Sequence, residues 1–201
     1  GYNVGDDVIL KLSTDSNNEV GPGNFQLIRL GDSAGGADIR DNLAGTFDQC
    51  AAVTDTMPTE PGNTVGPVAQ GLNTRFGIYN GPVSADEFPP DLVVTPGNYE
   101  QYQDAYNARN WDREDGVEGR RIIAVPFGDC SGTVNGSGDV DILGLGCVFL
   151  TNPATQAGNT QEIHGQIIDA CNTGGVPGPE PVIGVGPHTI QLYGNTAEWD
   201  S

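Results

Sequence analysis

Glycine and proline interrupt this chain so often that no long helix or strand fits into it. The 201 residues include 30 glycines and 14 prolines. Both types end regular structure, because glycine adds backbone freedom whereas proline fixes φ and lacks an amide proton. Hydrophobic residues still make up 36% of the chain. Intrinsically disordered chains contain fewer hydrophobic residues than this. We therefore expect a folded, turn-rich and mostly β protein.

Alternating and β-branched segments predict where the strands lie. Candidates are residues 4–13, 23–32, 120–128, 139–152, 161–171 and 188–195. The last four follow one another between glycine, asparagine and proline breaks, which predicts successive antiparallel strands. No repeat or change in composition divides the chain. The sequence predicts one domain over residues 1–201, an antiparallel, β-sandwich-like fold with two or three short helices and long Gly/Pro-rich loops.

Three short segments repeat apolar or aromatic side chains at helical spacing. Their stripes are Ile39, Leu43 and Phe47; Val68, Leu72 and Phe76; and Tyr99, Tyr102 and Tyr106. Side chains three or four residues apart share one face of a helix. We expect the tyrosine helix at the surface with one face packed, because its other positions are polar.

The stretch "TEPGNTVGPVAQGLNTRFGIYNG" carries glycines at the spacing of a phosphate-binding loop. A P-loop also needs a lysine and a hydroxyl residue directly after its second glycine. Leu72 and Asn73 follow Gly71 instead, so the phosphate-binding interpretation fails on chemistry.

We expect this stretch to be architectural. Gly62, Gly66 and Pro67 are predicted to set a turn into a helix that starts at Gly66-Pro67, since proline is tolerated at the first helical position. Replacing Gly66 with valine should destabilise the domain if its φ is positive. Arg75 is predicted to pair with a carboxylate beneath the loop.

No complete catalytic set is visible. The segment "GDSAGG" at residues 31–36 is similar to the serine loop of trypsin-like proteases, but Ala34 replaces a glycine of that loop. Both histidines, His164 and His188, follow the serine, whereas in that family the histidine precedes it. The carboxylate pairs Asp139/Asp141 and Asp112/Asp115 have the chemistry for glycoside hydrolysis but no defined separation. We expect no enzymatic activity.

Calcium is the metal that the acidic loops favour, because it prefers oxygen ligands. Asp15, Asn17 and Glu19 have alternating ligand spacing, but Val20 and Gln26 replace the glycine and glutamate of an EF-hand. The segment "GSGDVDIL" is similar to one unit of a calcium-binding β-roll, which needs several stacked copies. We predict no cofactor and no metal site, with calcium as the alternative.

The formal net charge of −19, with Lys11 as the sole lysine, argues against nucleic acid and anionic membranes as partners. No apolar run of about 18 residues is present, and the first residues do not form a signal peptide. We expect no membrane insertion of this segment. An exported domain would need a signal on a segment outside this chain.

Four cysteines and the absence of a C-x-x-C motif favour disulfides in an oxidising compartment. They are Cys50, Cys130, Cys147 and Cys171. If the strands at 120–171 form a simple meander, hairpin counting places Cys130 and Cys171 at the same end and Cys147 in mid-strand. This favours the pairs Cys130–Cys171 and Cys50–Cys147. Three connectivities stay open, because a bulge at Gly144 or Gly146 would shift the register.

The order of motifs resembles a known family over nearly the whole chain, residues 6–201. The motifs are "PGNFQLIRLG", "GGADIRDNLAGTFDQC", "TEPGNTVGPVAQGLNTRFGIYNGP", "RRIIAVPFGDCSG", "LGLGCVFLTNP", "IHGQIIDAC" and "IQLYGN". In this order they resemble the C-terminal extracytoplasmic region of bacterial TadG-like proteins of Flp pilus assembly. The resemblance implies a bacterial, extracellular or cell-surface location and no catalytic residues.

We therefore expect a non-enzymatic structural or assembly component of a pilus or extracellular filament. Its partners would be copies of itself or other filament subunits. The alternative is a secreted carbohydrate- or calcium-binding adhesin domain, which would use aromatic side chains such as Tyr99, Tyr102 and Trp111. A buried Tyr102 favours the first interpretation, and an exposed Tyr102 favours the second.

Overall fold

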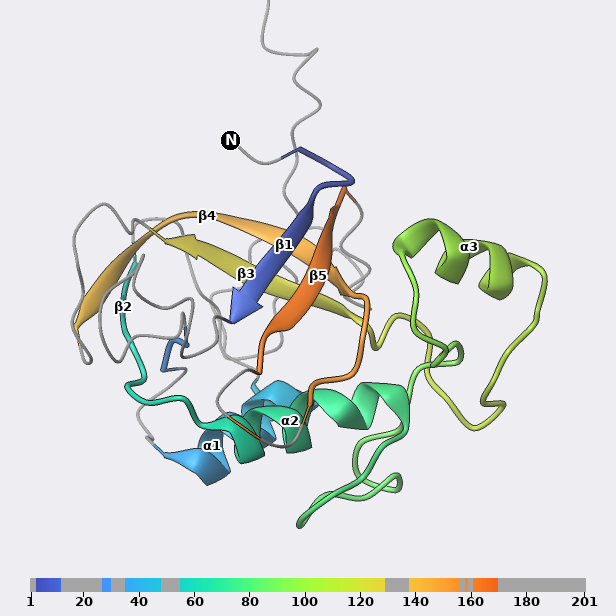
Figure 1. Cartoon of the computed structure of the whole chain (residues 1–201), viewed down its shortest axis with the longest axis horizontal. Coiled ribbons are helices and arrows are strands. Elements are labelled where there is room, and N and C mark those ends of the chain that lie inside the picture. Colours follow the sequence, from blue (N-terminus) through green and yellow to red (C-terminus); the bar gives the residue numbers. More distant parts are fainter. Residues whose placement is uncertain are drawn as a thin grey trace, which may run out of the picture.

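A computed structural model describes residues 3–11, 27–29, 35–47, 55–128, 138–155, 158 and 161–169. Within these ranges five strands form one antiparallel, curled sheet (Figure 1): β1 (Asp7–Lys11), β2 (Thr56–Pro58), β3 (Ile122–Gly128), β4 (Asp139–Leu150) and β5 (Ile163–Ile168). The helical segments are α1 (Gly36–Asp41), η2 (Asn42–Thr46), α2 (Val65–Asn73), η3 (Thr74–Phe76) and α3 (Tyr99–Asn107).

Strand β4 is the centre of the sheet, because three other strands pair with it. β3 follows it for most of its length, β5 pairs with its C-terminal end and β2 with its first three residues. β1 pairs with β5. The predicted antiparallel succession of β3, β4 and β5 is confirmed.

A bulge interrupts the pairing of β3 with β4. Phe127 lies opposite Gly144 and Gly128 lies opposite Ile142, so Leu143 is an extra residue of β4. Leu143 is accordingly 64% exposed. A Cβ at Gly146 would lie 2.4 Å from the Phe127 ring, so glycine is required where this ring crosses β4. The register shift that the sequence left open therefore lies beside Gly144.

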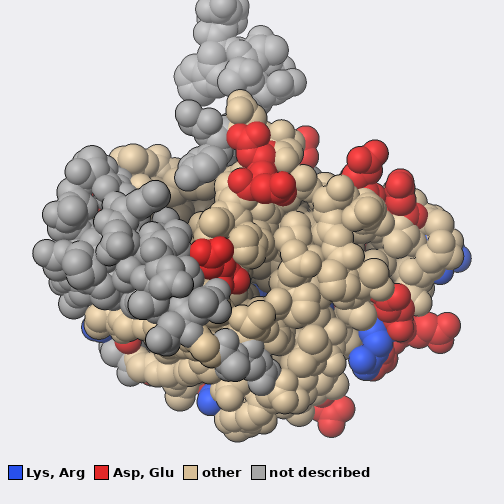
Figure 2. Space-filling view, viewed as in Figure 1, with Lys and Arg blue, Asp and Glu red and all other residues tan. Residues whose placement is uncertain are grey.

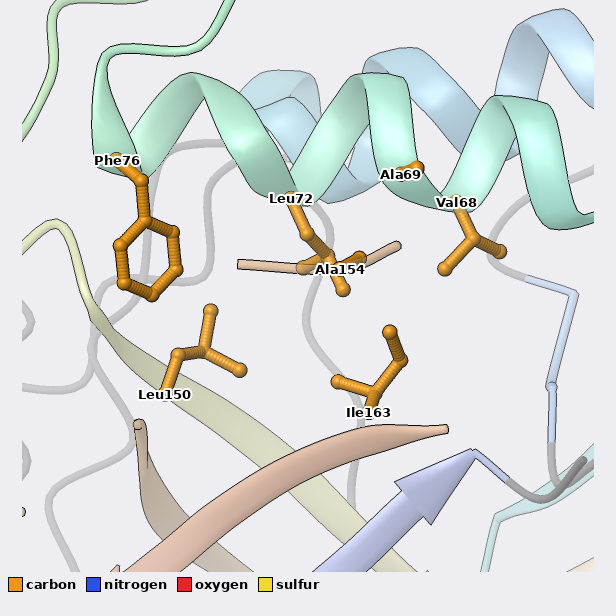
Figure 3. Packing of buried hydrophobic residues seen from close by; sticks show 7 residues of the cluster. All are labelled: Val68, Ala69, Leu72, Phe76, Leu150, Ala154 and Ile163. Atoms are coloured by element: carbon orange, nitrogen blue, oxygen red, sulfur yellow. The ribbon is translucent and has the colours of Figure 1, made fainter. Parts of the chain in front are cut away.

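The second helix covers one face of the sheet with its predicted apolar stripe. Val68, Leu72 and Phe76 are all buried and face Leu150 of β4 and Ile163 of β5 (Figure 3). Their spacing of four residues keeps them on one side of a continuous helical segment, which runs from α2 into η3. This prediction is confirmed.

The third helix covers the opposite face. Tyr102 lies 4.9 Å from the Phe149 ring, between ring centroids, in a cluster that also contains Cys147 and Ile168. Phe149 and its neighbour Leu150 point to opposite sides because side chains alternate along a strand. In the described residues both faces are thus covered by helices, and the predicted sandwich of two sheets is not confirmed.

Other predicted elements differ in length or lie elsewhere. The first predicted helix is divided into α1 and the π-helical turn η2. Within η2 the backbone of Gly45 is not helical, with a φ of 127°. The predicted strand at 23–32 is described only at 27–29, where Ile28 forms one bridge with Thr59. The predicted strand at 188–195 lies outside the described residues.

Candidate functional site

The turn that precedes α2 has two residues with positive φ, of which only the non-glycine Thr64 is strained. Gly62 has a φ of 94° and Thr64 a φ of 43°, values that residues with side chains rarely adopt. The helix begins at Val65, so Pro67 occupies its third position rather than the predicted first. Gly66 has no positive φ, and a Cβ there would meet open space. The condition for the predicted destabilisation at Gly66 is therefore not met. The positive φ values lie at Gly62 and Thr64, and the strain lies at Thr64.

Arg75 is buried, but it donates to backbone carbonyl groups and not to the predicted carboxylate. Its guanidinium donates to Leu43 O at 2.8 and 3.2 Å and to Arg120 O at 2.5 Å. Burial and the charge of Arg120 lower the pKa of Arg75 to about 9, although the Asp91 carboxylate opposes this shift. Arg75 thus ties η2 and the start of β3 to the end of the α2 segment.

Arg121 is fully buried and binds more carbonyl groups than any other described side chain. The acceptors lie 2.9–3.3 Å from its nitrogens and are Val93 O, Thr95 O, Gly97 O, Leu150 O and Thr151 O. Its guanidinium carbon lies 4.3 Å from the Phe149 ring centroid and 4.7 Å from that of Phe76. Burial lowers the pKa of Arg121 to about 10, and Asp91 counteracts this effect. The side chain joins the loop at 93–97 to the end of β4.

Asp91 is the acidic group of this region and has no exposed surface. Its carboxylate accepts from the Arg121 amide at 2.8 Å and from the Tyr102 hydroxyl at 3.1 Å. Burial raises the pKa of Asp91, whereas these hydrogen bonds and the charge of Arg121 lower it. Tyr102 also accepts from the Gly119 amide at 3.2 Å. Asp91 therefore connects α3 with the segment that enters β3.

We call Arg75, Arg120, Arg121 and Asp91 the buried arginine network. Arg120 completes it by donating to Pro89 O and Ala44 O, each at 2.9 Å. The guanidinium groups of the three arginines donate to backbone carbonyls. Charge-assisted bonds of this kind hold irregular segments firmly. The network thus fixes the loops in place.

Three of the four carboxylates that the sequence analysis considered for glycoside hydrolysis are engaged in local structure. Asp112 accepts from the amides of Val94 and Thr95, both at 2.8 Å. Asp115 pairs with Arg113 at 2.7 Å, and Asp141 accepts from the Thr56 hydroxyl at 2.8 Å. Through these contacts Asp112 and Asp115 stabilise loops, and Asp141 stabilises the pairing of β2 with β4.

Other candidate residues lie apart or outside the described ranges. His164 on β5 is half exposed and lies 3.5 Å from the Glu162 carboxylate, between Nε2 and Oε2. Within the described residues no group of three His, Cys, Asp or Glu side chains has the arrangement of a metal site. The candidates outside the described residues are Asp15, Asn17, Glu19, Ala34, Cys50, Cys130, Cys171 and His188. Cys147 lies in mid-strand opposite Ala124 and Ile168, and the disulfide pairing stays a prediction.

A second buried polar cluster was not predicted from the sequence. Lys11, at the end of β1, is 1% exposed and donates through Nζ to Asn63 Oδ1 at 2.5 Å and to Gln161 O at 3.3 Å. Asn63 belongs to the strained turn before α2. Burial lowers the pKa of Lys11 to about 8, and the charge of Glu162 acts in the opposite direction. The feature of the sequence that could have indicated this cluster is Lys11 itself, the sole lysine of the chain, which stands within a predicted strand.

No family model, curated protein or solved structure matches this chain. The resemblance to TadG-like proteins therefore stays a prediction. Across the ranges that the structure describes, no helix has both the length and the apolar composition needed to cross a bilayer.

Proposed function

We propose that this domain is a non-enzymatic structural or assembly component of a bacterial surface pilus or related extracellular filament. The observation that carries the proposal is the burial of Tyr102, which is 6% exposed. Tyr102 stacks with Tyr99 and Tyr106 and packs on Phe149. The aromatic stripe that an adhesin would present to a sugar thus contributes its central member to the core.

The use of positive charge supports the same proposal. Lys11, Arg75 and Arg121 are buried, while acidic side chains predominate over basic ones on the face drawn in Figure 2. The cations therefore stabilise the interior of a chain with a net charge of −19. A rigid, acidic domain with anchored loops suits a subunit that must keep its shape outside the cell.

The test is the assembly state of the purified chain. Light scattering after size-exclusion chromatography, followed by negative-stain microscopy, is expected to show ordered oligomers or filaments at high protein concentration. A monomer that binds immobilised oligosaccharides, or that binds calcium by titration calorimetry, would contradict the proposal and favour the adhesin alternative. Trp111, which is 39% exposed and stacks with Tyr106, would report sugar binding by its fluorescence.

A further inference from the structure

The Lys11 amine lies within bonding reach of the Asn63 side-chain amide. Nζ of Lys11 is 2.5 Å from Oδ1 of Asn63. Because a carbonyl bond is about 1.23 Å long, Cγ of Asn63 lies no more than about 3.7 Å from Nζ. Reacting atoms in productive complexes are about 3–3.5 Å apart. The two groups are therefore placed for attack of the amine on the amide carbon.

The backbone on both sides holds this arrangement in place. Lys11 lies opposite Ile163 in the pairing of β1 with β5, directly beside a register shift. Asn63 lies between Gly62 and Thr64, the two positions of the turn with positive φ. The strand is held by its pairing with β5, and in the turn the Thr64 hydroxyl donates to Gly62 O at 3.1 Å. The two side chains therefore meet with little further loss of backbone freedom.

The chemical state of the amine favours reaction. Burial lowers the pKa of Lys11 to about 8, so the neutral form is far more abundant near neutral pH than for an exposed lysine. The neutral amine is the nucleophilic form. Glu162 directly precedes Ile163, the residue opposite Lys11, and its charge raises the pKa of Lys11 against the larger effect of burial. Its Oε2 also lies 3.5 Å from His164 Nε2. Its carboxylate has the chemistry to accept and return a proton.

We propose that Lys11 and Asn63 form an intramolecular isopeptide bond, with Glu162 as the proton carrier. Nζ attacks Cγ of Asn63, and the carboxylate takes a proton from Nζ. The bond between Cγ and Nδ2 then breaks, and the same proton goes to Nδ2, which leaves as ammonia. One amide replaces another, so the reaction needs no oxidant, reductant or second protein. The bond would close a loop between residues 52 positions apart in the chain.

This inference does not depend on the proposed function, because the reaction requires only the folded chain. The first test is the intact mass of the purified, fully reduced protein. It is expected to be lower than the sequence mass by about 17 Da, the mass of one ammonia molecule. A folded protein with the full sequence mass would overturn the proposal.

Peptide mapping locates the bond. Trypsin would leave the amidated Lys11 uncut, and peptides 1–29 and 41–75 would remain joined under reducing conditions. Cyclisation at the Asn-Gly sequences of residues 80–81 and 135–136 would also release ammonia. In that case peptides 1–11 and 12–29 would appear separately, which would contradict the proposal.

Three variants separate the chemistry from folding. Lys11→Arg keeps the positive charge but cannot form the amide, and Glu162→Gln keeps the shape but removes the proton carrier. Both are expected to show the full sequence mass, with Glu162→Gln retaining the circular dichroism of the wild type. Glu114→Gln, on an exposed loop, is the matched control and should keep the mass loss. Loss of ammonia in Lys11→Arg, or an unchanged joined peptide in Glu162→Gln, would refute the assigned roles.

Discussion

Replacing Arg121 with lysine tests whether the buried arginine network stabilises the fold by holding loop carbonyls. Five carbonyls accept from Arg121, and one of them, Thr151 O, also accepts from the Gly97 amide. A lysine ammonium has three donors, so at least one of the other four carbonyls loses its partner. A buried carbonyl without a donor costs about 1–3 kcal/mol. Weaker stacking on Phe149 adds about 1 kcal/mol, and the expected destabilisation is about 2–4 kcal/mol in total.

The assay is urea denaturation followed by circular dichroism, with Arg113→Lys as the matched control. Arg113 pairs with Asp115 at 2.7 Å, but their side chains are 35% and 61% exposed. Exposed ion pairs of this kind contribute little to stability, so the control should leave the urea midpoint close to that of the wild type. Equal effects of the two substitutions would refute the reasoning, because the number of buried acceptors would then not decide the cost.

Three further predictions concern backbone contacts, pH and cysteines. Gly71→Ala should lower the free energy of unfolding by about 1–3 kcal/mol, since its Cβ would lie 2.4 Å from Arg40 O. Gly66→Ala should raise it by about 0.5–1 kcal/mol, because alanine favours the helix and its Cβ would meet open space. Denaturation midpoints that move in the same direction in both variants would contradict this prediction. Burial raises the pKa of Asp91 above its usual 3.8, so the folded state binds that proton more tightly than the unfolded state. The free energy of unfolding of the wild type minus that of Asp91→Asn should therefore be greatest below a pH of about 4. It should fall as pH rises through the pKa of folded Asp91. Denaturation at several pH values would disprove the prediction if this difference rose with pH. Non-reducing peptide mapping should give two disulfides, Cys130–Cys171 and Cys50–Cys147. Each should raise the free energy of unfolding by about 2–4 kcal/mol. A cysteine that is alkylated without reductant would be the contrary result.

Local patterns in the sequence were sufficient for the second helix and for the central strands. The stripe of Val68, Leu72 and Phe76 predicts its own buried face, because helical spacing alone brings these side chains together. The run at 139–152 likewise predicts β4. In contrast, β2 has only three residues, which is too short for an alternating pattern to be recognised.

The partners of buried charges could not be predicted, because they come from distant segments. Arg75 was expected to find a carboxylate, but its nitrogens reach the carbonyls of Leu43 and Arg120. Arg121 stands at the start of a predicted strand, where a charged residue normally marks a solvated end. Only the folded arrangement of the loop at 93–97 and of the end of β4 reveals the five carbonyl acceptors around its guanidinium. The same holds for Lys11 and Asn63, which are 52 residues apart.

The position of β1 has a mechanical consequence. β1 lies at one end of the strand order, and its described pairing with β5 runs from Asp7 to Lys11. A pulling force on the N-terminal end would separate these residue pairs one after another, starting at Asp7, because they lie in series with the load. Lys11 is the last of them, and Asn63 connects it to the turn before α2. At that residue the tension would pass from the sheet into the helical layer, so peeling would meet its greatest resistance there.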